Sequence, residues 1–154
     1  MIYNSINMKV IAIASVGGHW VQLLRLRPAF EGSELIFVST KPDFAKMVEG
    51  SKFYAVADAS RWDKMKLIKS FFDVFGIIRR EKPDVVITTG AAPGLMGLIS
   101  AKILGKRTIW VDSIANVEEL SMSGKIASKF ASRVYTQWPQ LATDKILFAG
   151  NILS

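Results

Sequence analysis

The chain of 154 residues contains no cysteine and only one histidine, His19. The lack of cysteine excludes disulfides and thiolate metal sites, and a single histidine excludes a multi-histidine metal centre. We therefore expect neither a metal nor a cofactor. The sequence also lacks a membrane-spanning run, because its longest uncharged stretch, residues 85–101, is shorter than about 20 residues and is interrupted by glycine and proline. The first ten residues lack the pattern of a signal peptide.

Half of the residues are hydrophobic and 21% are charged, with a formal net charge of +7. This composition predicts one globular domain that comprises residues 1–154. The positive charge favours an anionic partner, such as a membrane surface, a nucleic acid or a phosphorylated substrate. No basic-aromatic module of the nucleic-acid-binding type is present, so we do not expect nucleic acid as the partner.

Strand-like and helix-like segments alternate along the whole chain, which predicts an α/β fold. Apolar runs predict strands, and periodic apolar positions bounded by glycine or proline predict helices. Because helices separate the strands, we expect a Rossmann-like, mostly parallel sheet with helices on both faces. The expected strands are 9–15, 34–40, 52–58, 84–90, 107–113, 133–137 and 145–150, and the expected helices are 19–26, 42–50, 62–81, 94–104 and 123–131.

The loop after the first expected strand reads Ser15-Val16-Gly17-Gly18-His19. Glycines free the backbone for close approach of a ligand, and the following helix N-terminus favours an anion. The dinucleotide fingerprint and the P-loop are both absent. Two interpretations stay open for the glycines, anion binding or a tight turn. For His19 they are contact with a phosphate or general-base catalysis, or a hydrogen bond to a backbone carbonyl.

Two further loops are expected at the carboxyl ends of the parallel strands, where ligands bind in such sheets. Thr89 and Gly90 end the fourth expected strand and Pro93 follows it, and Asp112 and Ser113 lie at the carboxyl end of the fifth. Ordinary turn and capping chemistry explains both loops equally well from the pattern alone.

The expected helix 62–81 is both basic and apolar. Its default interpretation is a core helix with a solvated face. The wide apolar arc and the flanking cations also suit a helix that rests on anionic lipid headgroups. The residues expected to touch such a surface are Lys66, Lys69, Phe71, Phe72, Phe75, Arg79 and Arg80.

Three segments together resemble a known family: "ASVGGHWVQLLRL" (14–26), residues 85–113, and "LSMSGKIASKFASRVYTQWPQL" (120–141). They are similar to the bacterial relatives of the membrane-anchoring subunit of the dolichyl-diphosphate N-acetylglucosamine transferase. These relatives are glycosyltransferase enhancer subunits in capsule and exopolysaccharide biosynthesis. The resemblance implies the N-terminal half of a GT-B glycosyltransferase, with a separately encoded catalytic subunit that supplies the other half.

The resemblance also implies partners and roles. The partners would be the catalytic subunit, a lipid-diphosphate-linked sugar acceptor, a UDP-sugar shared with that subunit, and the inner face of the cell membrane, where the chain would lie peripherally in the cytoplasm. Gly17, Gly18 and His19 match the family's glycine loop, and Thr89, Gly90 and Pro93 match its second loop. Asp112 replaces a common glutamate and Asn116 a common basic residue, so this chain departs from the family pattern at both positions.

Three functions follow as alternatives. The chain is the non-catalytic or acceptor-binding subunit of a two-component UDP-sugar glycosyltransferase, with Ser15, Gly17, Gly18, His19, Thr89, Gly90, Pro93, Asp112 and Ser113 at the acceptor site. Alternatively, it is a self-sufficient Rossmann-like enzyme that acts on a nucleotide or a phosphorylated small molecule. In the third alternative it is a scaffold that only docks the catalytic subunit on the membrane.

Overall fold

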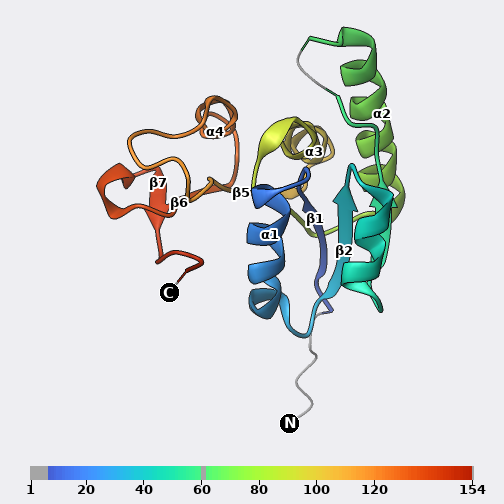
Figure 1. Ribbon diagram of the computed structural model, residues 1–154, viewed down its shortest axis with the longest axis horizontal. Coiled ribbons are helices and arrows are strands. Elements are labelled where there is room, and N and C mark those ends of the chain that lie inside the picture. The colour runs from blue at the N-terminus through green and yellow to red at the C-terminus, as the bar shows by residue number, and fades with distance from the viewer. Residues whose placement is uncertain (1–6, 60–61, 154) are drawn as a thin grey trace.

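A computed structural model describes residues 7–59 and 62–153 (Figure 1). Residues 1–6, on which the signal-peptide prediction partly rests, lie outside this range. The described residues form one seven-stranded sheet in the order β3-β2-β1-β4-β5-β6-β7. The strands are β1 (Lys9–Ile13), β2 (Glu34–Ser39), β3 (Lys52–Ala55), β4 (Val85–Thr88), β5 (Arg107–Val111), β6 (Arg133–Thr136) and β7 (Ile146–Phe148).

All neighbouring strands of the sheet pair in parallel, which extends the prediction of a mostly parallel sheet. Ile11 of β1 lies between Ile36 of β2 and Val86 of β4 in the register. All three side chains are fully buried. Continuous apolar strands of this kind are typical of a parallel sheet that is covered on both faces.

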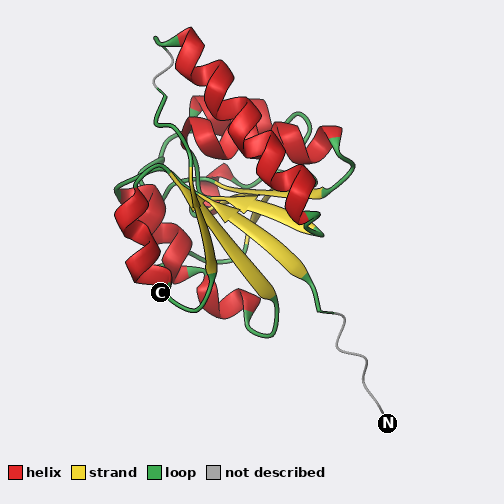
Figure 2. Ribbon diagram, turned by 90° about the vertical axis from the view of Figure 1, so that its right-hand side faces the viewer, coloured by secondary structure: helices red, strands yellow, loops and turns green. Residues whose placement is uncertain are grey.

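Helices cover both faces of the sheet, as predicted (Figure 2). One face packs against α2 (Lys64–Glu81), α3 (Ala91–Ile103) and α4 (Met122–Ala127). The other face packs against α1 (Gly18–Arg25) and the two 3₁₀ helices η1 (Arg27–Phe30) and η2 (Pro42–Val48). A third 3₁₀ helix, η3 (Pro139–Leu141), lies between β6 and β7.

Three helical elements differ from the prediction. The expected helix 42–50 is the 3₁₀ helix η2, which begins at Pro42. The expected helix 123–131 is shorter and begins one residue earlier, because the Ser121 hydroxyl accepts a hydrogen bond from the Gly124 amide and caps α4. The helix α3 begins at Ala91 rather than at residue 94, so Pro93 lies in its first turn.

A buried ion cluster closes the amino end of the sheet. The Glu81 carboxylate at the end of α2 accepts hydrogen bonds from the Tyr54 hydroxyl and from the Lys52 ammonium, and it forms a 3.0 Å ion pair with Lys9. Its side chain is only 5% exposed. The Tyr54 hydrogen bond is the main reason that the pKa of Glu81 is lowered to about 2, and the bonds from Lys52 and Lys9 add to this effect.

Across residues 7–59 and 62–153, no helix combines the length and the apolar character that are needed to cross a bilayer.

Candidate functional site

The topology of the sheet marks one edge as the place for a ligand. The chain winds outward from β1 through β2 to β3 on one side and from β4 to β7 on the other. The strand order therefore reverses between β1 and β4, which are hydrogen-bonded neighbours. In open α/β sheets, ligands bind at such a switch point, beyond the carboxyl ends of the strands. The loops that follow β1 and β4 are the two predicted glycine loops.

The loop after β1 exposes the N-terminus of the helix α1. Gly17 precedes α1 with φ of +78°, a left-handed conformation that favours glycine. No side chain caps α1, and both Gly17 and Gly18 are exposed. The first amide groups of α1 therefore remain available as donors, and the helix dipole adds positive potential. This geometry suits an anion such as a phosphate.

His19 and Thr89 join the two glycine loops through reciprocal hydrogen bonds. The His19 Nδ1 lies 3.0 Å from the carbonyl oxygen of Thr89, and the Thr89 hydroxyl donates to the carbonyl oxygen of His19 at 2.6 Å. His19 is half-buried, whereas Thr89 is fully buried. The sequence analysis left open whether His19 binds a carbonyl or a ligand. The structure shows the carbonyl contact at one ring nitrogen, which leaves the other nitrogen for a ligand.

The predicted site residues divide into an exposed group and a buried group. Gly17 and Gly18 are exposed, and Ser15 and His19 are half-buried. The members of the buried group are Thr89, Gly90, Pro93, Asp112 and Ser113. The accessible surface of this candidate site is therefore built mainly by the loop after β1, and the predicted residues of the other two loops are buried beneath it.

Asp112 organises the loop that follows β5. Its carboxylate accepts hydrogen bonds from the Trp110 indole, from the Asn116 amide, and from both the hydroxyl and the backbone amide of Ser121. Asp112 is 2% exposed, and all four of these donors belong to β5 or to the loop itself. This arrangement closes the loop 112–121 over the end of β5. It also explains Asn116, which serves the carboxylate rather than facing solvent as a free donor.

Gln22 and Gln137 form a buried polar link that the sequence analysis missed. The Gln22 side chain donates to the Ser113 hydroxyl at 3.1 Å and accepts from the Ile114 amide at 3.1 Å. Gln137 donates to the Gln22 side chain at 2.7 Å and to the Asp112 carbonyl at 2.9 Å. These bonds fix α1 against the ends of β5 and β6. The one feature of the sequence that could have indicated this link is the glutamine on the apolar face of α1.

The residues predicted to touch a membrane occupy different parts of α2. This helix begins at the edge where the strands end and runs back toward the amino end of the sheet (Figure 1). Lys66, Lys69 and Phe72 are exposed, and Phe72 is 65% exposed. Phe71 and Phe75 are half-buried and stack on each other.

Arg79 and Arg80 are exposed at the other end of α2, about 20 Å along the helix axis from Lys66. The Arg80 guanidinium lies 5.2 Å from the centre of the Tyr54 ring, next to the Glu81 cluster. The predicted membrane residues therefore form two separate groups, of which the first lies on the half of α2 that begins beyond the carboxyl ends of the strands (Figure 1).

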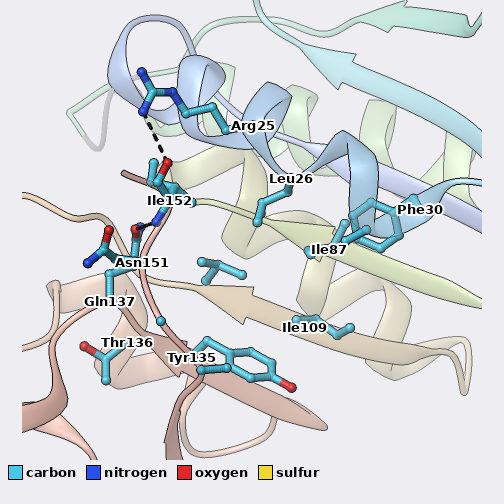
Figure 3. Close-up of a pocket in the computed structure, with 14 residues that line it drawn as sticks. Arg25, Leu26, Phe30, Ile87, Ile109, Tyr135, Thr136, Gln137, Asn151 and Ile152 are labelled. Atoms are coloured by element: carbon cyan, nitrogen blue, oxygen red, sulfur yellow. Dashed lines mark hydrogen bonds between the residues drawn. The ribbon is translucent and has the colours of Figure 1, made fainter. Parts of the chain in front are cut away.

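An apolar slot of about 510 Å³ lies on the α1 face of the sheet (Figure 3). Ile87, Ile109 and Tyr135 line it from β4, β5 and β6, and Phe30 of η1 lies at its rim. The chain segment 149–152 borders it, where Ile152 is held by hydrogen bonds with Arg25 and Gln137. The sequence does not predict this slot, because the residues that line it come from separate strands. Among the described residues, no group of three acidic or histidine side chains could hold a metal ion.

Comparison with known sequences gives a consistent family. A family model described as "Oligosaccharide biosynthesis protein Alg14 like" matches residues 33–151. The chain is 43% identical over 81 residues to the UDP-N-acetylglucosamine transferase subunit alg14 of Schizosaccharomyces pombe, a match that covers 47% of this chain and 35% of that protein. It is 26% identical over 181 residues to the human subunit ALG14, which covers 96% of this chain and 84% of that protein.

Comparison with solved structures shows the fold. The crystal structure of Acinetobacter baumannii MurG matches with a TM-score of 0.77 and 16% sequence identity, over 94% of this chain and 46% of that chain. The predicted Rossmann-like half-domain of the GT-B fold is thereby confirmed. The chain spans less than half of MurG and about a third of the fission yeast protein that it matches.

Proposed function

The chain belongs to the family of Alg14-like oligosaccharide biosynthesis proteins, and from this premise we propose that it is the acceptor-binding subunit of a two-component UDP-sugar glycosyltransferase. The partner is a separately encoded catalytic subunit that forms the other half of a GT-B enzyme and holds most of the UDP-sugar. The relatives are named as subunits of a UDP-N-acetylglucosamine transferase, so UDP-N-acetylglucosamine is the first donor to test. The chain is inactive without this partner.

The observation that carries the proposal is the uncapped N-terminus of α1 at the switch point of the sheet. The exposed Gly17 and Gly18 allow a diphosphate to reach the free amides of α1. His19 presents one ring nitrogen beside that position, where it would take the proton from an acceptor hydroxyl. A lipid diphosphate that carries a sugar has both groups, an anion for the helix and a hydroxyl for the histidine.

The N-terminal half of α2 supports a membrane-bound acceptor. Met65, Ile68 and Phe72 recur at helical spacing on one face, and they are 81%, 57% and 65% exposed. Lys66 and Lys69 are exposed on the same part of the helix. An apolar stripe flanked by cations fits an anionic bilayer surface. Because α2 begins at the end of the sheet where the strands and the glycine loops end (Figure 1), the lipid chain of the acceptor would remain in the bilayer while its diphosphate reaches α1.

We extend the proposal to the biological context. The acceptor is an undecaprenyl-diphosphate-linked sugar, the protein lies peripherally on the cytoplasmic face of the membrane, and the product is a repeat unit of a capsule or an exopolysaccharide. The departures at Asp112 and Asn116 do not oppose this function, because both residues stabilise the loop after β5 and neither needs to contact the acceptor.

Two binding measurements test the proposal against the self-sufficient enzyme. Isothermal titration of the isolated chain with UDP-N-acetylglucosamine should show weak or no binding, and vesicles that contain undecaprenyl diphosphate should bind more tightly than vesicles with undecaprenol. The reverse result, tight nucleotide-sugar binding without a partner, would establish the self-sufficient enzyme instead.

Replacement of His19 separates the acceptor-binding subunit from a pure scaffold. The variant His19→Ala should capture the partner subunit normally but lower the transfer rate of the complex by about 100-fold or more, the usual scale for loss of a general base. Pull-down and radiolabelled sugar transfer measure the two effects. Full transfer activity in a complex that contains His19→Ala would support the scaffold and overturn the acceptor role of the histidine.

A further inference from the structure

We propose that Thr89, Gly90 and Ala91 are positioning residues that hold His19 in one tautomer, with the proton on Nδ1 and the lone pair on Nε2. The inference rests on the proposed function, in which His19 meets the acceptor hydroxyl. It adds what the loop after β4 contributes, although most of that loop is buried and unable to contact a ligand.

The first step is the identity of the hydrogen-bond partner. The Thr89 carbonyl oxygen is only an acceptor, so His19 Nδ1 must donate across the 3.0 Å contact. In neutral imidazole only one nitrogen carries a proton, and Nε2 is therefore the acceptor. Within the part of the chain that the structure describes, Nε2 has no hydrogen-bond partner. A general base needs its lone pair on the nitrogen that faces the substrate, and this tautomer supplies it.

The second step is the seat of the imidazole ring. A Cβ atom at Gly90 would lie 2.7 Å from Nδ1 and 2.8 Å from Cε1 of His19, closer than real Cβ contacts. The ring therefore lies directly against the Gly90 backbone, which only glycine permits. Gly90 also has φ of +132°, a conformation that other residues rarely adopt.

The third step is the support beneath Gly90. The Thr88 hydroxyl accepts a hydrogen bond from the Gly90 amide at 3.1 Å. That hydroxyl fits beside α3 only because residue 94 is glycine, since a Cβ there would lie 1.9 Å from it. Thr88 is fully buried, so the peptide that carries the ring is anchored to the core.

The fourth step is backbone strain at Ala91, where φ is +68°. A residue with a Cβ pays roughly 1–2 kcal/mol for the left-handed conformation. Such strain persists where the surrounding structure fixes the backbone, and it is concentrated at functional sites. Here it occurs one residue after the ring's seat and two residues after the carbonyl that binds Nδ1.

The decisive measurement is the ¹⁵N NMR spectrum of the neutral imidazole ring. His19 is the only histidine of the chain, so [¹⁵N]histidine labelling of untagged protein gives one pair of ring signals. We expect a protonated Nδ1 and an unprotonated Nε2, the opposite of the tautomer that histidine prefers in water. A protonated Nε2 in the wild-type chain would overturn the proposal.

The variant Gly90→Ala should displace the ring and convert the spectrum to a mixture or to the other tautomer. Its control is Gly105→Ala, where φ is also positive (+73°) but no heavy atom lies within 4 Å of the added Cβ. The control should lower the stability as well but leave the ring signals unchanged. Identical ring signals in Gly90→Ala and the wild type would contradict the role of Gly90 as the ring's seat.

If Gly90→Ala folds poorly, the variant Ala91→Gly provides a second test of the same proposal. It relieves the strain without adding atoms, so the chain should be equally or more stable while the ring signals broaden or shift toward the other tautomer. In the reconstituted complex, we expect kcat to fall about tenfold or more in Gly90→Ala with KM changed less than about twofold, because a misplaced base affects the chemical step.

The spectra are recorded on this chain alone, so they test the tautomer of His19 separately from the proposed function. If the proposed function is wrong, the complex that contains the wild-type chain will not transfer sugar. A changed tautomer in Gly90→Ala together with unchanged kcat would overturn the link between ring position and the reaction.

Discussion

Single residues in this protein show how buried polar groups support the surface at which we propose that the acceptor binds. Gly17 and Gly18 meet solvent directly, whereas Thr89 and Asp112 act from within the core. Both kinds of residue were predicted as one set, because a sequence pattern places residues at a strand end without indicating which way each side chain points.

Asp112 provides a prediction about the loop after β5. Its replacement by asparagine removes the charge and turns a donor toward one of the four groups that donate to the carboxylate. An unsatisfied buried group of this kind costs about 1–3 kcal/mol. We expect Asp112→Asn to lower the free energy of unfolding by this amount and to speed hydrogen exchange at the Ser121 amide and the Trp110 indole. Exchange as slow as in the wild type would show that the carboxylate does not hold the loop.

Glu81 provides a prediction about pH. Its folded-state pKa of about 2 lies below the ordinary value of 4.5, so the ionised form stabilises the fold above pH 4.5. This contribution is lost as the pH falls from 4.5 toward 2, and it amounts to roughly 3 kcal/mol. Urea unfolding at pH 7 and pH 3 measures it. The variant Glu81→Gln should be less stable at pH 7 and should lose less stability between these pH values than the wild type does.

An equal loss of stability in Glu81→Gln and wild type between pH 7 and pH 3 would contradict this assignment. Asp43→Asn is a suitable control, because its carboxyl is exposed and lies at the start of η2, away from the Glu81 cluster.

At the level of elements, the strands and the helices between them could be predicted. Apolar strand segments alternate along the chain with periodic helical segments that end at glycine or proline. Gly105 ends α3 with φ of +73°, and Pro83 follows the end of α2, as the sequence indicated. The differences between the predicted and the observed elements are local. A single sequence does not distinguish a 3₁₀ helix from an α-helix at 42–50. It offers both Ser121 and Ser123 as caps of the helix that follows them, and the structure shows that Ser121 is the cap.

The contacts that build the site could not be predicted in the same way. His19 and Thr89 are 70 positions apart, and Gln22 and Gln137 are 115 apart. The order of the strands predicts that the loops lie together at the carboxyl ends of the strands. The pairing of particular side chains between these loops depends on rotamers and on the position of α1 relative to the loop after β4.

The helix α2 provides a prediction at the scale of an element. Replacement of Lys66 and Lys69 by glutamine should weaken flotation with anionic vesicles, since each basic residue near such a surface contributes about 1 kcal/mol. The effect should decrease at high salt. Replacement of Arg79 by glutamine is the matched control, because that residue lies at the other end of the helix.

The apolar stripe gives an independent arm of the same test. Ile68→Asn should reduce binding to neutral and anionic vesicles alike, because Ile68 is 57% exposed and its apolar surface would enter the bilayer. Equal binding by the lysine variant and the Arg79 variant would exclude the N-terminal half of α2 as the charged membrane contact.

The whole molecule is a single parallel sheet with a ligand edge at its switch point, and it matches less than half of the MurG chain. Its positive net charge and its exposed α2 stripe suit a membrane surface, while the glycine loops suit a diphosphate. Under the proposed function, these properties belong to one wall of a cleft between two subunits. The account therefore requires a second chain that brings the donor sugar to the same edge.

The most direct test of this account is the rate of sugar transfer from UDP-N-acetylglucosamine to undecaprenyl-diphosphate-linked sugar in vesicles, measured with the partner subunit alone and after addition of this chain. We predict that neither protein alone transfers sugar at a significant rate and that the mixture does so at least about 100-fold faster. A partner subunit that reaches the same rate without this chain would contradict the central claim.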